Sequence, residues 1–186
     1  MTDELQRFGE LLSSRRTVNF YEPKPVDHGL IHDAVEVARW APNHRLTQPW
    51  KFFHLGPQTR SVIIDLAVEL AVKTKGDAAG AARRERLQAV PEWLAVASRI
   101  SDDTLLDMED YAATCCAVQN LMLYLHTAGI GTKWTSGAVT REPGTLEALG
   151  LHPDEYRVAG LIWIGYARQQ TESNRGPLNE VFSQLA

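Results

Sequence analysis

Residues 104–129, TLLDMEDYAATCCAVQNLMLYLHTAG, carry the longest helical signal in the chain and decide its kind of fold. Neither Gly nor Pro interrupts the stretch from Thr104 to Ala128, and residues 101–103 offer polar caps for its start. Gly129 follows at the position where a left-handed residue commonly ends a helix. Apolar side chains fall on several sides of this stretch. The pattern therefore predicts a long helix buried at the centre of the protein.

Shorter apolar stretches on both sides of this helix predict buried strands and amphipathic helices. The strands are expected at residues 49–55, 93–100 and 157–166, and the helices at residues 1–16, 28–41, 58–72 and 142–149. Asp27 is expected to cap the second of these helices. Because helices outnumber strands and do not alternate regularly with them, the order favours the α+β class over a parallel, doubly wound sheet. No internal repeat and no boundary between two cores is found, so residues 1–186 are predicted to form a single domain.

The composition is that of an ordinary globular protein and argues against polyanionic partners. The chain has 186 residues, of which 44% are hydrophobic and 23% charged. Its 19 basic and 23 acidic residues give a net charge of −4. Because this leaves no overall positive field, we expect neither nucleic acid nor a membrane surface as a partner, and any anion site must be local. The basic segment 73–90 is interpreted as a solvated, mobile helix or lid, since no aromatic residues are interleaved with its charges.

The cysteine content and the N-terminus both point to a reducing compartment. Cys115 and Cys116 are the only cysteines, and neighbours in sequence cannot form an unstrained disulfide. Within the predicted helix they are interpreted as packing residues. The N-terminal residues have no apolar signal-peptide core, and no apolar run reaches about 18 residues. A cytoplasmic protein is therefore predicted.

Several common catalytic motifs are absent from the sequence. Gly129 and Gly131 begin a G-x-G-x-x-G pattern, but Trp134 occupies its last position, and neither a phosphate loop nor G-x-S-x-G occurs. His28 and His32 have the i, i+4 spacing of metal ligands, but no third ligand is evident, so no metal site is predicted. His126 lies two to three helical turns beyond Cys115, too far for a Cys–His pair.

Three separated segments suit a ligand that is flat, aromatic and phosphorylated. Residues 14–17 provide two guanidinium groups and hydroxyls at the end of a helix, which suits a phosphate. Residues 41–50, APNHRLTQPW, form a polar loop between a helix and a strand. Residues 129–137 are rich in Gly and carry Trp134. Each segment alone is weak evidence.

Taken together, these segments resemble the FMN-dependent nitroreductase family. Its first motif is matched by Arg15-Arg16-Thr17 and Phe20, its second by Ala41-Pro42 and Gln48-Pro49-Trp50, and its third by Gly129, Ser136-Gly137 and residues 160–165. One position departs from the common pattern, because Leu46 stands where most members have Asn. Residues 42–45, PNHR, and 134–137, WTSG, are instead similar to the compact branch of short nitroreductases.

The resemblance implies a nitroreductase-like α+β fold, with a mostly antiparallel central sheet flanked by helices, in an intertwined homodimer with FMN at the subunit interface. Its implied activity is ping-pong transfer of a hydride through flavin N5 from NADPH or NADH to a nitroaromatic, quinone or related acceptor, with no catalytic side chain assigned. The implied FMN contacts are Arg15, Arg16, Thr17, Trp40, His44, Gln48, Trp134, Thr135 and Ser136. Arg175 is a further candidate for the phosphate.

Alternatives remain open at this stage. The same fold could serve a flavin-dependent dehydrogenase or dehalogenase, or a protein that stores or senses FMN. Arg15 and Arg16 could satisfy the last carbonyls of the first helix, and His44 could support its own loop. The sequence does not fix the physiological acceptor or the choice between NADH and NADPH.

Overall fold

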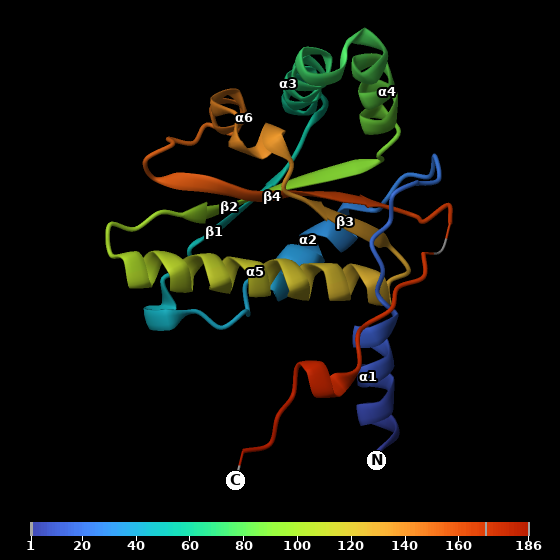
Figure 1. The fold of residues 1–186 in the computed structure, drawn as a ribbon, viewed down its shortest axis with the longest axis vertical. Helices are drawn as coiled ribbons and strands as arrows, with labels where there is room; N and C mark the ends of the chain where they lie inside the picture. The colour runs from blue at the N-terminus through green and yellow to red at the C-terminus, as the bar shows by residue number, and fades with distance from the viewer. Residues whose placement is uncertain (1, 170, 186) are drawn as a thin grey trace.

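A four-stranded antiparallel sheet lies between two layers of helices in a computed structural model that describes residues 2–169 and 171–185 (Figure 1). The strands are β1 (Trp50–His54), β2 (Glu92–Arg99), β3 (Gly131–Thr135) and β4 (Tyr156–Gly165), and their order in the sheet is β1-β2-β4-β3. The α-helices are α1 (Asp3–Ser14), α2 (His28–Ala38), α3 (Pro57–Lys75), α4 (Asp77–Gln88), α5 (Thr104–Thr127) and α6 (Pro143–Ala148). Short 3-10 turns are η1 (His44–Leu46), η2 (Ala138–Arg141) and η3 (Leu178–Glu180). The predicted α+β class is confirmed.

The two central strands are buried, whereas the outer strands are not. In β2 every residue from Trp93 to Ser98 is buried, and β4 is buried from Ala159 onward. Strand β1 lies at the edge of the sheet, and only Trp50 in it is buried. The prediction of a buried strand at 49–55 is therefore correct in position and wrong in burial, since an aromatic run looks the same at an edge as in the middle.

Helices α2 and α5 cover one face of the sheet, and α3, α4 and α6 lie on the other side (Figure 1). Helix α5 is buried on the side that carries Ala113, Ala117 and Leu121, but Met108 and Cys116 on its other side are exposed. The prediction of a fully buried helix was thus wrong for one side, and Cys116 is not a packing residue.

The basic segment 73–90 comprises the end of α3, Gly76 and helix α4, and most of its residues are exposed, so the prediction of a solvated helix is confirmed. Helix α4 lies against α3, and a Cβ atom at Gly80 would come within 2.4 Å of Val72 Cγ2. Leu87 is 1% exposed, and Arg84 forms an ion pair of 2.8 Å with Asp65. Its glycine, which weakens a helix in isolation, is what permits this close approach.

The predicted caps of two helices and the predicted end of the long helix are confirmed, whereas α2 ends three residues before the predicted position 41. The side chain of Asp27 accepts a hydrogen bond from the Gly29 N–H at the start of α2, and Asp103 accepts from Leu105 and Leu106 at the start of α5. Gly129 adopts a φ of 75° immediately after α5, the left-handed conformation that glycine reaches at low cost.

Helix α1 and the C-terminal segment extend from the same end of the molecule, away from the sheet (Figure 1). No residue of α1 is buried, although Leu5, Phe8 and Leu12 are large and apolar. The C-terminal segment contains only the turn η3 and exposes Val181, Phe182 and neighbouring apolar side chains. Nowhere in residues 2–169 and 171–185 is a helix long and apolar enough to cross a membrane.

Candidate functional site

A pocket of about 620 Å³ opens where the end of α1 meets the end of α5. We call it the arginine pocket; it is lined by Ser14, Arg15, Arg16, Val18, His126, Gly129, Ile130, Gly131, Thr132, Ala167, Gln169, Thr171, Glu172, Ser173 and Asn174. Two of the three predicted segments, around Arg15 and after Gly129, therefore meet in one place. The C-terminal segment, which carried no motif, forms the remaining wall.

The floor of the arginine pocket is held by backbone pairing between distant parts of the chain. Thr17 forms an isolated parallel bridge with Thr132, and the Val18 N–H donates to the Thr132 carbonyl at 3.0 Å. A Cβ atom on Gly131 would lie 2.5 Å from Val18 Cγ2, so this pairing requires glycine at position 131. Thr17 is thus placed beside β3, with its carbonyl accepting from the Thr171 hydroxyl at 3.4 Å.

Positive charge is concentrated at Arg15. Partial burial lowers the pKa of Arg15 below its ordinary value, and the charges of Arg16 and Arg175 lower it further. Three guanidinium groups therefore act on one another at this pocket, an arrangement that a bound anion would stabilise. Arg175 comes from the C-terminal segment, where its Nη1 donates to Ser173 Oγ at 2.7 Å.

Arg16 also serves the backbone of its own helix. Its Nη1 donates to the Ser13 carbonyl at 2.5 Å and to the Arg15 carbonyl at 2.9 Å. These bonds satisfy carbonyls that the end of α1 leaves without helical partners. The alternative of helix capping is therefore observed for Arg16, while its side chain still lines the arginine pocket.

His126 is a pocket residue that the sequence analysis did not assign. Its Nε2 lies 3.0 Å from Ser14 Oγ and so joins the last turn of α5 to the end of α1. Burial lowers the pKa of His126, with further contributions from the charges of Arg15 and Arg16. The signal available in the sequence was its place in the last helical turn before Gly129, next to a predicted ligand segment.

A second hollow, of about 420 Å³, lies beneath the loop after α2. We call it the Trp40 hollow; it is lined by Arg39, Trp40, Ala41, Pro42, Asn43, Leu46 and Gln48. Trp40 is 77% exposed and Leu46 78% exposed, which is unusual for large apolar side chains in a polar loop. Trp40 and Gln48 are brought together here, away from the arginine pocket of the same chain.

The backbone of this loop is strained. Arg45, Leu46 and Gln48 have φ values of 55°, 54° and 45°, in the left-handed region that non-glycine residues seldom adopt. Side-chain bonds hold the conformation: Asn43 Oδ1 accepts from the Gln48 N–H at 2.9 Å, and Thr47 Oγ1 donates to Asp110 Oδ1 at 2.5 Å. Such strain persists where the surroundings enforce it, and it occurs often at ligand sites.

His44 lies in the same loop and is exposed, with its Nε2 accepting from Arg45 Nε at 3.1 Å. This bond joins His44 to the next residue of its own loop. Asn43, which the sequence analysis mentioned only as part of the loop, makes the bonds that shape it.

The third group of predicted residues lies at the end of β3. Trp134 is half-buried, and its Nε1 donates to the Ala159 carbonyl at 3.0 Å. The indole lies over Gly160, where a Cβ atom would come within 2.1 Å of it. Thr135 is half-buried and Ser136 is exposed, and the Ser136 carbonyl accepts from Arg141 at 3.4 Å. Among these residues, only Ser136 presents an exposed side chain to a ligand.

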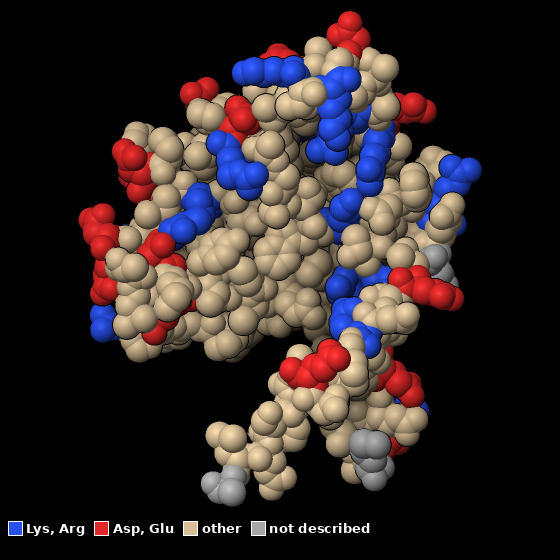
Figure 2. All heavy atoms as spheres, viewed as in Figure 1, with Lys and Arg blue, Asp and Glu red and all other residues tan. Residues whose placement is uncertain are grey.

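Charge is unevenly distributed over the surface despite the negative total. Figure 2 shows Lys and Arg side chains gathered along one side of the molecule, from the helices α3 and α4 down to the end of α1. Many acidic side chains lie toward the left edge of this view, and others stand beside the basic ones at the top, on the right and near the end of α1. What the arginine pocket offers an anion is therefore a set of local donors.

The geometry therefore suits a ligand with a phosphate group. Arg15 and Arg16 supply cationic donors, and Ser14 and His126 supply uncharged ones. Arg175 adds its charge from the C-terminal segment. Glu172 also lines the pocket and stands at its outer wall in the C-terminal segment.

Comparison with known proteins decides the family. The sequence model described as "Nitroreductase family" matches residues 12–166, which is most of the chain. This chain belongs to the nitroreductase family. The resemblance found in the three segments is confirmed, and the matched region includes all nine predicted contact residues.

Relatives with the same family description extend over nearly the whole chain. YfhC, a candidate NAD(P)H nitroreductase of Bacillus subtilis (strain 168), is 31% identical over 185 residues, covering 95% of this chain and 93% of its own. The crystal structure of a nitroreductase-like family protein from Bacillus cereus has a TM-score of 0.84 at 27% identity and covers 95% of both chains. The nitroreductase-like fold is thereby confirmed.

A further solved structure with the same fold contains bound NADPH. The nitroreductase NfnB from Mycobacterium smegmatis, described as FMN-dependent and solved in complex with NADPH, has a TM-score of 0.80 at 17% identity. It covers 99% of this chain and 100% of its own. At this identity the likeness establishes the fold alone.

Proposed function

We propose that this nitroreductase-family protein is an FMN-dependent NAD(P)H oxidoreductase that works as a homodimer of single-domain chains. It would pass electrons in ping-pong order from NADPH or NADH to a nitroaromatic, quinone or related small-molecule acceptor. FMN, when bound, supplies the hydride chemistry at its N5. The observation that carries this proposal is the arginine pocket, whose charge and size suit a flavin phosphate.

The arginine pocket would hold the phosphate end of FMN. Arg15 and Arg16 would bind its oxygens through charge-assisted hydrogen bonds, with Arg175 as a third donor. His126 and Ser14 would add neutral contacts from the helix ends. Thr17 and Ser136 are proposed to contact the remainder of the cofactor. Thr17 lies beside β3 through its bridge to Thr132, and Ser136 directly follows the last residue of β3.

The Trp40 hollow would complete the site from a second chain. Trp40, His44 and Gln48 lie outside the arginine pocket of their own chain, so they serve the same cofactor only if a partner brings them there. Trp134 and Thr135 would support the site from β3 mainly by positioning, because the Trp134 indole is bonded to the sheet. The strained backbone at Gln48 supports a ligand role for this loop.

The exposed apolar faces support a homodimer. A helix of the length of α1 is only marginally stable when it packs on nothing, and no residue of α1 is buried within its own chain. Leu5, Phe8 and Leu12 and the C-terminal Leu178, Val181, Phe182 and Leu185 all expose apolar surface. A second copy of the chain would cover both segments at once, in the manner of an intertwined dimer.

No side chain of the pocket is proposed as a nucleophile. The protein's own part is to bind the cofactor, to stabilise negative charge with Arg15 and Arg16, and to leave a face open for NAD(P)H and the acceptor in turn. A cytoplasmic location is part of the proposal, because Cys115 and Cys116 are both free thiols and suit a reducing compartment.

The visible absorption spectrum of the purified protein tests the proposal. We expect a yellow protein that bleaches anaerobically with NADPH or NADH and recovers its colour when a nitroaromatic or quinone is added. Bleaching without turnover of any acceptor would favour a flavin sensor instead. A colourless protein that does not bind added FMN would contradict the proposal.

A further inference from the structure

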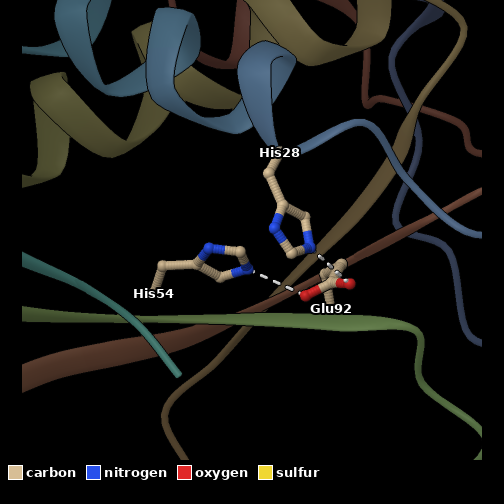
Figure 3. A group of neighbouring side chains, drawn as sticks. All are labelled: His28, His54 and Glu92. Atoms are coloured by element: carbon tan, nitrogen blue, oxygen red, sulfur yellow. Dashed lines mark hydrogen bonds and ion pairs between the residues drawn. The ribbon is translucent and has the colours of Figure 1, made fainter. Parts of the chain in front are cut away.

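Two histidines and a glutamate converge at the edge of the sheet, in a region with no part in the proposed flavin site. His28 Nε2 lies 3.2 Å from Glu92 Oε1, and His54 Nε2 lies 2.8 Å from Glu92 Oε2. All three ligand atoms lie within 4.8 Å of one another. Figure 3 shows both imidazole rings directing a nitrogen toward the one carboxylate.

The three residues come from three elements that are held independently. His28 is the first residue of α2, just after the Asp27 cap, while His54 ends β1 and Glu92 begins β2. The Leu55 N–H donates to the Trp93 carbonyl at 2.9 Å, which fixes the ends of β1 and β2 beside each other. The cluster is therefore imposed by tertiary structure and not by a flexible loop.

The two imidazole rings meet edge to face and are not stacked in parallel. Their centroids lie 4.7 Å apart at an interplanar angle of 86°. In a tetrahedral zinc site with bonds of about 2.0 Å, neighbouring ligand atoms lie about 3.3 Å apart. In this structure the two nitrogens contact different oxygens of Glu92, at 3.2 Å and 2.8 Å, so a bound ion would replace these two hydrogen bonds with metal–ligand bonds.

The cluster opens onto a groove that can admit further ligands. This groove has a volume of about 520 Å³ and includes His28, His54 and Glu92 in its lining. The side chain of Glu92 is 20% exposed and that of His54 is 32% exposed, so both are accessible but partly shielded from water. Two imidazoles and one carboxylate with open positions are a donor set that suits Zn²⁺ and neighbouring first-row divalent ions.

Arg60 and Arg84 are the cations that face the same groove. Arg84 is paired with Asp65 at 2.8 Å. The Arg60 guanidinium donates to the backbone carbonyls of Leu87, Gln88, Val90 and Pro91. Its donors are therefore taken by the chain that leads into Glu92, so Arg60 interacts with the carboxylate through its charge and forms no ion-pair contact with it.

We propose that His28, His54 and Glu92 form a binding site for one divalent transition-metal ion, with Zn²⁺ as its principal ion, that ties the start of α2 to the edge of the sheet. His28 and His32 have the spacing of metal ligands, although no metal site was predicted from them, and only His28 belongs to this cluster. His32 is 83% exposed at its side chain and lies 3.6 Å from Asp33, outside the cluster.

Calorimetric titration of the chelator-treated, flavin-loaded protein with ZnCl₂ tests the site. We expect one Zn²⁺ per chain, and a loss of affinity of at least about 10-fold in His54→Asn and in Glu92→Gln. His32→Asn, on the same helix, is the matched control and should bind as the wild type does. MgCl₂ should give no binding, since Mg²⁺ prefers oxygen ligands.

A second pair of measurements keeps the test decisive if a substitution at the partly shielded His54 or Glu92 affects folding. His28→Asn alters an exposed side chain, so it should retain the wild-type circular dichroism and flavin content while losing Zn²⁺ affinity. X-ray absorption at the zinc edge should show two imidazole nitrogens among the ligands. No Zn²⁺ binding by the wild type, or equal affinity in His28→Asn and the wild type, would overturn the proposal.

Discussion

The Ser14 hydroxyl and the His126 ring lie 3.0 Å apart, across 112 positions of sequence, and join the end of α1 to the last turn of α5. Because Arg15 and Arg16 follow Ser14 directly, this contact brings the cationic groups of one segment to the helix that leads into Gly129. The arginine pocket is thus built from segments that lie far apart in the chain, near residues 14–18, 126–132 and 167–174.

Arg15→Ala should weaken FMN binding by about 1.5 to 3 kcal/mol, the usual contribution of a hydrogen bond to a charged group. Fluorescence quenching of FMN on titration with protein measures this change. Lys73→Ala, which removes the same charge from an exposed position at the end of α3, is the control and should leave FMN affinity unchanged. Equal affinities of Arg15→Ala and the wild type would remove Arg15 from the site.

His126 should make FMN binding depend on pH. Burial, together with the charges of Arg15 and Arg16, holds the pKa of His126 below its ordinary value of 6.5 in the free protein. A bound phosphate offsets the arginine charges and raises this pKa, so binding takes up a proton and affinity falls as pH rises through the bound-state value. FMN titrations of the wild type and His126→Asn between pH 5 and 8 measure the effect, and the difference between them removes the titration of the phosphate itself. Identical pH profiles would show that His126 does not respond to the ligand.

Gly160→Ala should destabilise the protein by about 1 to 3 kcal/mol, because the new methyl group would overlap the Trp134 indole, 2.1 Å away at closest. Urea denaturation gives the free energy of unfolding. Gly9→Ala, at an exposed helical position with nothing within 4 Å, is expected to stabilise the protein by up to about 1 kcal/mol through helix propensity. If Gly160→Ala were as stable as the wild type, Trp134 would not be fixed against β4 as described.

The ion pair between Asp107 and Arg157 should stabilise the fold at neutral pH and lose this effect in acid. Burial acts to raise the pKa of Asp107, but hydrogen bonds from Arg157 and the Ser101 N–H lower it more, so the net pKa lies below 3.8. The unfolded chain therefore binds a proton first as pH falls, and the stabilisation is lost as pH drops from about 4 toward the folded-state pKa. Because the Arg157 side chain is 38% exposed, Asp107→Asn should cost only about 1 kcal/mol at pH 7.

Thermal or urea unfolding of Asp107→Asn at pH 7 and pH 3 measures this effect, with Asp154→Asn, at an 87% exposed side chain, as the control. A deficit of the same size at both pH values would mean that the ion pair is not the cause.

Phe8→Ser should shift the protein from dimer toward monomer. Phe8 is 55% exposed, and no residue of α1 is buried within its own chain, so a partner would have to cover this apolar surface. Light scattering after size-exclusion chromatography gives the mass. A wild-type monomer, or a dimer unaffected by Phe8→Ser together with Leu12→Ser, would contradict the proposed interface.

The features that sequence could predict are those encoded locally. The caps at Asp27 and Asp103, the left-handed Gly129 and the positions of all four helices expected from periodicity follow from neighbouring residues. The partial exposure of β1 was missed because the edge position of Trp50–His54 depends on which strands pair. The contact of Ser14 with His126, and the meeting of His28 and His54 at Glu92, join residues far apart in the chain, and no local pattern predicts such pairs.

The most direct test of the central claim compares FMN with riboflavin, which lacks the phosphate, in titrations of the cofactor-free protein. If the arginine pocket binds the phosphate, FMN should bind at least about 100-fold more tightly, and Arg15→Ala should remove most of that preference. Equal affinity for FMN and riboflavin would contradict the assignment of this pocket.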